Sequence, residues 1–192
     1  MWFKRILSQL HRYVLWLMIS IFLWSWIFTL ITDTTKERKV TVCADTPAML
    51  DSELAEALSY DLPEGIKLIK VFPFKYAMFN TADIDRADIL ILHESEIEEH
   101  TATLCAICTE SFDTTGGYEK DGAVYGLLLF DAASGTAKAS DYFTFTSVDA
   151  EGKPTSENYY LCFNERSVHL GDMNSSADDA AIIIAKRILD LP

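Results

Sequence analysis

A run of twenty consecutive residues without a charged side chain, residues 13–32, constrains this chain more than any other feature. As a helix rising about 1.5 Å per residue, the run spans about 30 Å, the thickness of the hydrocarbon core of a bilayer. A helix satisfies every backbone polar group internally, as lipid requires. The alternative, a buried core helix, is disfavoured because such a long core helix usually keeps a polar face. We therefore predict a transmembrane helix at residues 13–32.

The same run is longer than the apolar core of a cleaved signal peptide, which has about 7–15 residues. No small-residue cleavage site follows it, so we expect an uncleaved anchor. Three basic residues lie on each side of the run, which leaves the positive-inside count tied. The free amino terminus, together with Asp33 and Glu37, favours a cytoplasmic N-terminus.

Charge divides the chain into two dissimilar regions. Residues 1–39 carry six basic and two acidic side chains, whereas residues 40–192 carry 10 basic and 27 acidic ones, a net charge of −17. This acidity argues against a nucleic-acid partner, which selects a basic surface. We expect residues 1–12 in the cytoplasm, 13–32 in the lipid of the cell membrane, 33–39 as a juxtamembrane linker, and 40–192 as an extracytoplasmic domain.

The pattern of the second region predicts an α/β fold in one three-layer domain with a mixed sheet. A parallel β-α-β-α-β opening is expected first, followed by antiparallel additions. The expected strands are residues 39–44, 66–72, 87–92, 124–130, 142–148 and 158–163. The expected helices are residues 47–58, 76–79, a helix beginning at Glu96, and a closing helix at 177–191 with Ser175 or Ser176 as its cap.

Several segments of this region resemble a known family. An opening strand at residues 40–44, then ADILIL followed by HESEIEE, and later YYLCFNERSVHLG followed by ADDAAIIIAKRIL, are similar to the first lobe of type II periplasmic solute-binding proteins. The resemblance implies a parallel sheet in the order second, first, third strand, with a polar residue at the ligand cleft after the third. Only one of the family's two lobes is matched, so closure on a solute between two lobes is not implied.

Polar residues after the expected strands are the candidate ligand-binding residues, because ligands of open α/β sheets bind outside the carboxyl ends of the strands. Asp45 and Thr46 follow the first strand, whereas His93, Glu94 and Ser95 follow the third. Asn164 follows the last strand and completes the set. The simpler interpretation is that Asp45, Thr46 and Ser95 only cap helices, a role that needs no ligand.

No metal site or cofactor is predicted. Two histidines share one helix face and bind zinc when they are four residues apart, but position 97, four residues after His93, is isoleucine. His93 and His100 are seven apart, and the acidic residues between them are typical of a solvated helix face.

The four cysteines leave three interpretations open: plain thiols, a structural disulfide or zinc site, and a redox pair. Cys105 and Cys108 have the spacing of a redox motif, but no helix is predicted to follow them and lower the pKa of the first thiol. Cys43 and Cys162 lie within apolar strands, as small buried side chains do.

We expect a non-catalytic, membrane-anchored binding or accessory domain, which the resemblance would place beside the subunits of an ABC-type uptake transporter; whether it has a small-molecule ligand is left open. The alternatives are an envelope thiol-disulfide protein that uses Cys105 and Cys108, or a structural subunit of a membrane complex. Ser167, His169 and Asp172 have the residue types of a hydrolase triad, but no G-x-S-x-G elbow accompanies them. No catalytic residue is therefore predicted.

Overall fold

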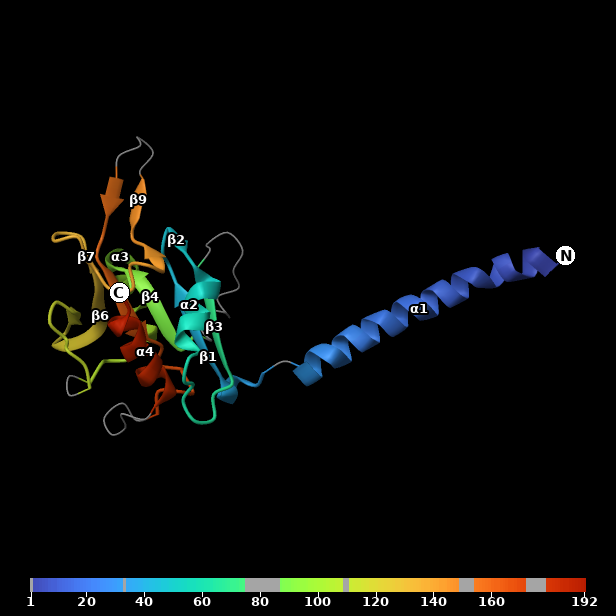
Figure 1. Cartoon of the computed structure of the whole chain (residues 1–192), viewed down its shortest axis with the longest axis horizontal. Coiled ribbons are helices and arrows are strands. Elements are labelled where there is room, and N and C mark those ends of the chain that lie inside the picture. Colours follow the sequence, from blue (N-terminus) through green and yellow to red (C-terminus); the bar gives the residue numbers. More distant parts are fainter. Residues whose placement is uncertain (1, 33, 75–86, 109–110, 149–153, 172–178) are drawn as a thin grey trace. The chain divides into compact units, whose positions relative to one another are not determined.

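The computed structural model describes residues 2–32, 34–74, 87–108, 111–148, 154–171 and 179–192. It divides into two compact units, residues 1–35 and 36–192. The first unit is the helix α1 (Trp2–Thr32) (Figure 1). Within α1 the structure describes the side chains of residues 12–28. Among the described residues, no helix is long and apolar enough to cross a membrane. The membrane span at residues 13–32 stays a prediction.

The second unit is built on a seven-stranded mixed sheet, which confirms the predicted α/β class. Its strands run in the order β3-β1-β4-β11-β6-β5, and β7 pairs with β6. The strands β3, β1 and β4 are parallel, whereas β11, β6, β5 and β7 are added in antiparallel fashion. Their bounds are β1 (Lys39–Ala44), β3 (Leu68–Pro73), β4 (Ile89–His93), β5 (Tyr118–Lys120), β6 (Ala123–Asp131), β7 (Thr136–Ala137) and β11 (Tyr159–Phe163).

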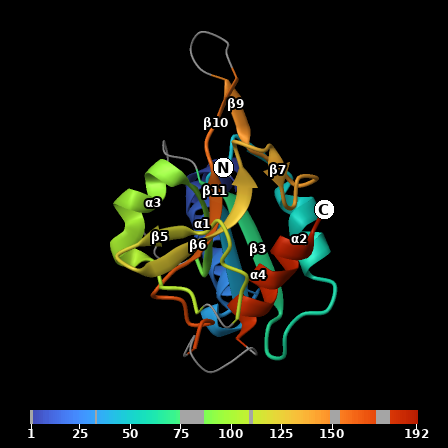
Figure 2. The same cartoon turned by 90° about the vertical axis from the view of Figure 1, so that its left-hand side faces the viewer.

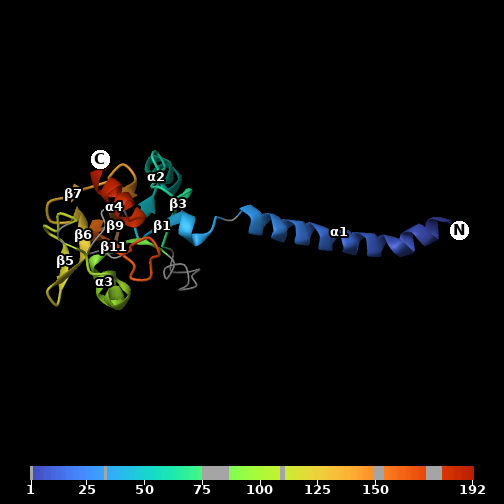
Figure 3. The same cartoon turned by 90° about the horizontal axis from the view of Figure 1, so that it is seen from below.

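Helices lie on both faces of this sheet. On one face, α2 (Asp51–Leu58) and α4 (Ala180–Asp190) pack over the larger core, and α3 (Glu94–His100) lies on the opposite face (Figures 2 and 3). Successive residues of β4 alternate between the two cores: Ile89 and Ile91 join the first, Leu90 and Leu92 the second. This double burial explains why the strand has an almost uninterrupted apolar sequence.

Two expected elements differ strongly from the observed ones, and the helix expected from Glu96, α3, begins two residues earlier, at Glu94. The helix expected from residue 47 begins at Asp51, because β2 (Ala48–Met49) first pairs with β8 (Phe143–Thr144). The strand expected at residues 142–148 is divided, since β8 pairs with β2 whereas β9 (Thr146–Val148) pairs with β10 (Pro154–Ser156). The helix expected at residues 76–79 and the caps Ser175 and Ser176 lie outside the described residues.

The segment that leads into the sheet belongs to the second unit. Residues 36–39, expected in the linker, form the 3-10 turn η1 (Lys36–Arg38) and the first residue of β1. The ring nitrogen Nε2 of buried His169 lies 2.8 Å from the carbonyl oxygen of Lys36 and 3.2 Å from that of Lys39. Both oxygens only accept hydrogen bonds, so Nε2 carries a hydrogen and fastens the start of the unit.

Candidate functional site

A topological switch point lies between the carboxyl ends of β1 and β4. Along the chain, β3 is the next strand of this sheet after β1, and it pairs on one side of β1. The strand after that, β4, pairs on the other side of β1. Crevices of this kind are where open α/β sheets bind ligands. Asp45 directly follows β1, and its N–H donates to the carbonyl oxygen of Ile91 on β4 (2.8 Å). His93 is the last residue of β4, so the two side chains meet at this edge.

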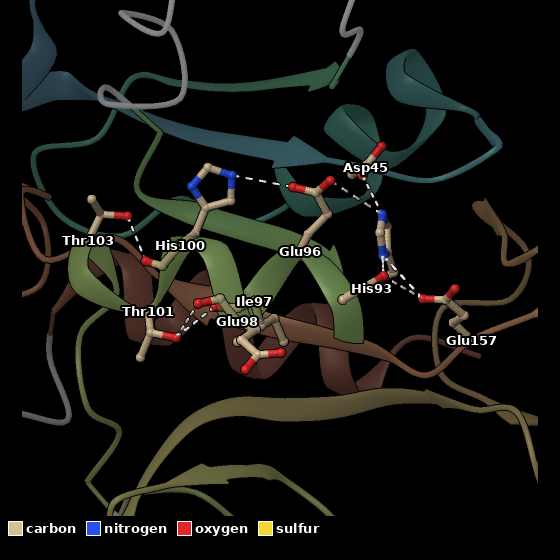
Figure 4. Close-up of polar contacts among 10 residues, drawn as sticks. Asp45, His93, Glu96, Ile97, Glu98, His100, Thr101, Thr103 and Glu157 are labelled. Carbon is tan, nitrogen blue, oxygen red and sulfur yellow. Dashed lines mark hydrogen bonds and ion pairs between the residues drawn. The ribbon is translucent and has the colours of Figure 1, made fainter.

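Two carboxylates converge on one nitrogen of the His93 ring (Figure 4). Nε2 lies 3.2 Å from Asp45 Oδ2 and 3.8 Å from Glu96 Oε1. The second oxygen of Glu96 lies 3.3 Å from Nε2 of His100, one turn further along α3. The side chains of Asp45 and Glu96 are only 17% and 11% exposed. We call Asp45, His93 and Glu96 the carboxyl-edge cluster.

The other nitrogen of the ring is held by a short relay. His93 Nδ1 lies 2.7 Å from Ser95 Oγ, which donates its hydrogen bond to Glu157 Oε2 at 2.8 Å. A hydroxyl has one hydrogen, and an ionised carboxylate only accepts. Ser95 therefore accepts from Nδ1–H, and the ring does not act as a base toward this serine. Nε2 is the nitrogen that faces the carboxylates of Asp45 and Glu96.

Burial shapes the protonation of this site. Loss of solvent raises the pKa of Asp45 above its ordinary value, and the nearby Glu96 carboxylate raises it further, whereas His93 opposes both effects. Burial also raises the pKa of Tyr159 to about 12. The Tyr159 ring packs edge-on against His93, with centroids 6.1 Å apart, and limits the ring's movement.

Three of the six predicted site residues come together: Asp45 and His93 directly, and Ser95 through Nδ1. The capping interpretation of Asp45, Thr46 and Ser95 is wrong. The N-caps of α2 and α3 are Leu50 and His93, and neither makes a side-chain capping bond.

The other three predicted residues are engaged elsewhere. Thr46 Oγ1 donates to the carbonyl oxygen of Ala48, and Glu94 accepts from Nδ2 of Asn158. Asn164 lies beside the amino end of β4, at the opposite end of the strands, because β11 runs antiparallel to β4 and pairs Phe163 with Ile89. The expectation that Asn164 lies beside the first-strand residues is therefore wrong.

Two residues of the site, Glu96 and Glu157, were not predicted. Glu96 lies one helical turn after His93, a spacing of three that brings side chains together within a helix. Glu157 reaches this edge because the antiparallel β11 begins here. If residues 158–163 are taken as a strand antiparallel to β4, the residue before this strand, Glu157, replaces Asn164 as the candidate.

The contacts of the other candidate groups, as far as the described residues show them, disfavour the reactive sites considered. Burial and the nearby Glu165 raise the pKa of Cys105, which disfavours its reactive thiolate. All four cysteines are free thiols in the structure. Ser167 Oγ donates to Asp88 at 2.5 Å, and the ring of His169 is occupied by backbone carbonyls. Asp172, the third residue type of the suspected triad, lies outside the described residues.

Comparisons with known proteins add little to this geometry. The sequence matches no protein-family model and no curated protein. Among solved structures, thiaminase I from Bacillus thiaminolyticus is similar to 48% of this chain, with 16% sequence identity and a TM-score of 0.36. The match spans 28% of the thiaminase chain. A likeness this weak supports no conclusion about fold, substrate or activity.

Proposed function

We propose that the chain is a membrane-anchored, non-catalytic binding protein of the cell membrane, with an accessory role beside a transporter. Residues 13–32 would lie in lipid, with the N-terminus in the cytoplasm and residues 40–192 outside it. The uncharged run and the opposite charges of the two regions support the anchor. The order β3-β1-β4 is the one expected of a single lobe that resembles a solute-binding protein.

One observation carries the binding role: the carboxyl-edge cluster lies at the switch point between β1 and β4. Its side chains are largely buried and come from two strand ends that are far apart in the sequence and from the first turn of α3. The relay through Ser95 directs that hydroxyl to Glu157 rather than activating it, so binding is favoured over acyl transfer.

The binding role is tested by thermal unfolding of the full-length chain in detergent micelles with a panel of amino acids, sugars, organic acids, phosphate and divalent cations. A ligand that binds only the folded state raises the midpoint by mass action. We expect at least one member to do so, and Asp45→Asn to abolish the shift. Glu99→Gln, which removes a charge from the exposed side of α3, is the matched control. A panel without any shift would contradict the binding role.

The anchor is tested by washing native membranes with alkaline carbonate. The full-length chain is expected to stay in the pellet, and a variant that lacks residues 1–35 to appear in the supernatant. Replacing Phe22 with arginine places a charge near the middle of the run, at a cost of about 2.5–3.5 kcal/mol on insertion scales. It should reduce the retained fraction. Release of the unmodified chain by carbonate would refute the anchor.

A further inference from the structure

Carboxylates gather around the imidazole of the carboxyl-edge cluster. Three carboxylates, those of Asp45, Glu96 and Glu157, lie within 4 Å of the two nitrogens of the His93 ring. Asp45 and Glu96 are the partly buried members of this set, whereas Glu157 is 58% exposed, and His100 brings a second imidazole to Glu96. Partly buried carboxylates need a counter-charge because they have lost hydration. A cation held between Asp45 and Glu96 would supply that charge to both at once.

The donor atoms have the spacing of a metal site. One atom from each of Asp45, His93 and Glu96 can be chosen so that all three lie within 4.8 Å of one another. Around a tetrahedral ion with bonds of about 2.1 Å, donors are about 3.4 Å apart. The observed distances from Nε2, 3.2 Å to Asp45 and 3.8 Å to Glu96, lie on either side of that value.

The second nitrogen of His93 is held as that of a metal-bound histidine usually is. A metal-bound histidine almost always donates its other N–H to an oxygen acceptor, which fixes the tautomer. Here Nδ1–H donates to Ser95, which is hydrogen-bonded to Glu157. The contact between His100 and Oε2 of Glu96 leaves Oε1 directed at His93 (Figure 4). Nε2 is therefore the nitrogen that faces the two carboxylates and would give its lone pair to a bound cation.

We infer that Asp45, His93 Nε2 and Glu96 bind a divalent transition-metal cation, with Ser95, Glu157 and His100 as the residues that position these ligands. The mixed set of one imidazole nitrogen and two carboxylates suits Zn²⁺ and its first-row neighbours. Mg²⁺ and Ca²⁺ take sets of oxygen ligands instead. This inference rests on the proposed function and names its ligand class.

The test measures Zn²⁺ binding to the full-length chain in detergent micelles by equilibrium dialysis and calorimetry, after removal of metals with a chelator. One ion per chain is expected to bind tightly and to raise the unfolding midpoint. His93→Gln and Glu96→Gln should each weaken binding at least tenfold, and Ser95→Ala about tenfold, because outer partners of a ligand are typically worth 10–100-fold. Glu99→Gln removes the same charge from α3 and should bind as the unmodified chain does.

Far-ultraviolet circular dichroism of each variant shows that loss of binding is not loss of folding. Equal binding by His93→Gln, or no stoichiometric binding by the unmodified chain, would overturn the inference. If a solute of the panel stabilises the chain through Asp45 while Zn²⁺ does not, the cation inference falls and the binding role stands. If Zn²⁺ binds through His93 while carbonate releases the chain, the cation site stands and the anchor falls.

Discussion

Replacing Asp88 with alanine is expected to lower the free energy of unfolding of the second unit by about 2–4 kcal/mol, the cost of removing a charged acceptor from buried donors. Asp88 is 3% exposed and lies directly before β4. Its carboxylate accepts from the N–H of Thr41 at 2.7 Å and from Ser167 Oγ at 2.5 Å. It thereby joins β1 to the segment that follows β11. Alanine would leave the buried Thr41 N–H without its acceptor.

Urea unfolding of the full-length chain, followed by the near-ultraviolet dichroism of its tyrosines, measures this loss. All four tryptophans lie in residues 1–39, whereas every tyrosine except Tyr13 lies in residues 40–192, so tyrosine signals report mainly on the second unit. Asp88→Asn, which keeps one acceptor oxygen, is the matched control and should cost about 1 kcal/mol, the net worth of one hydrogen bond. Equal losses in both variants would show that the hydrogen bonds are not what stabilises this position.

The difference in stability between the unmodified chain and Asp88→Asn is also expected to depend on pH. Burial raises the pKa of Asp88 above its ordinary value of 3.8, although Ser167, Thr41, His169 and Lys36 each oppose the rise. The folded protein then binds this proton more readily than the unfolded chain, so this group's contribution to stability decreases as pH rises from 3.8 through the folded pKa. The unmodified chain should therefore gain stability relative to Asp88→Asn as pH falls from 7 toward 4. A relative loss over that range would contradict the raised pKa.

The second large effect is expected from Phe163→Ala, at about 3–5 kcal/mol, the usual cost of truncating a buried phenylalanine. Phe163 ends β11, is fully buried, and packs at 5.6 Å between ring centroids against Phe112. Its neighbour Phe112 also lies under the ammonium group of Lys186 on α4. The deletion would therefore open a cavity between the sheet and α4.

The same unfolding measurement checks Phe163→Ala, with Phe163→Leu as its control. Leucine keeps most of the buried volume and is expected to cost less than half as much. Metal binding at the opposite edge should be unchanged in the folded fraction of both variants. If alanine and leucine cost the same, the cavity argument is wrong at this position.

The elements with strong local patterns could be predicted from the sequence. Residues 89–92 are apolar throughout because β4 is covered on both faces, and the closing helix of residues 177–191 contains α4 with Ile184 and Ile188 buried as expected. The division of residues 142–148 between β8 and β9 could not be predicted. It depends on pairing with β2 and β10, and neither of these short strands has a pattern of its own.

The candidate site was predictable only where the strands are parallel. Asp45 and His93 were found by the rule that ligands bind at carboxyl ends of strands. The rule failed for Asn164, because β11 runs in the opposite direction. Glu157, 64 residues from His93, could be placed only once that direction was known. The capping interpretation failed for Asp45 and Thr46 because pairing between β2 and β8 delays the start of α2 until Asp51, and for Ser95 because α3 already begins at Glu94.

The place of β11 in the sheet has a consequence for biogenesis. This strand lies between β4 and β6 and joins the parallel half to the antiparallel half, yet it is the last strand to be synthesised. At about 5–20 residues per second, the ribosome needs about 3.5–14 s to proceed from the end of β4 to the end of β11. During that interval the apolar edge of β4 lacks its neighbour, and such an edge readily pairs with other chains. The nascent polypeptide therefore passes through an aggregation-prone stage that ends only when residues 159–163 insert.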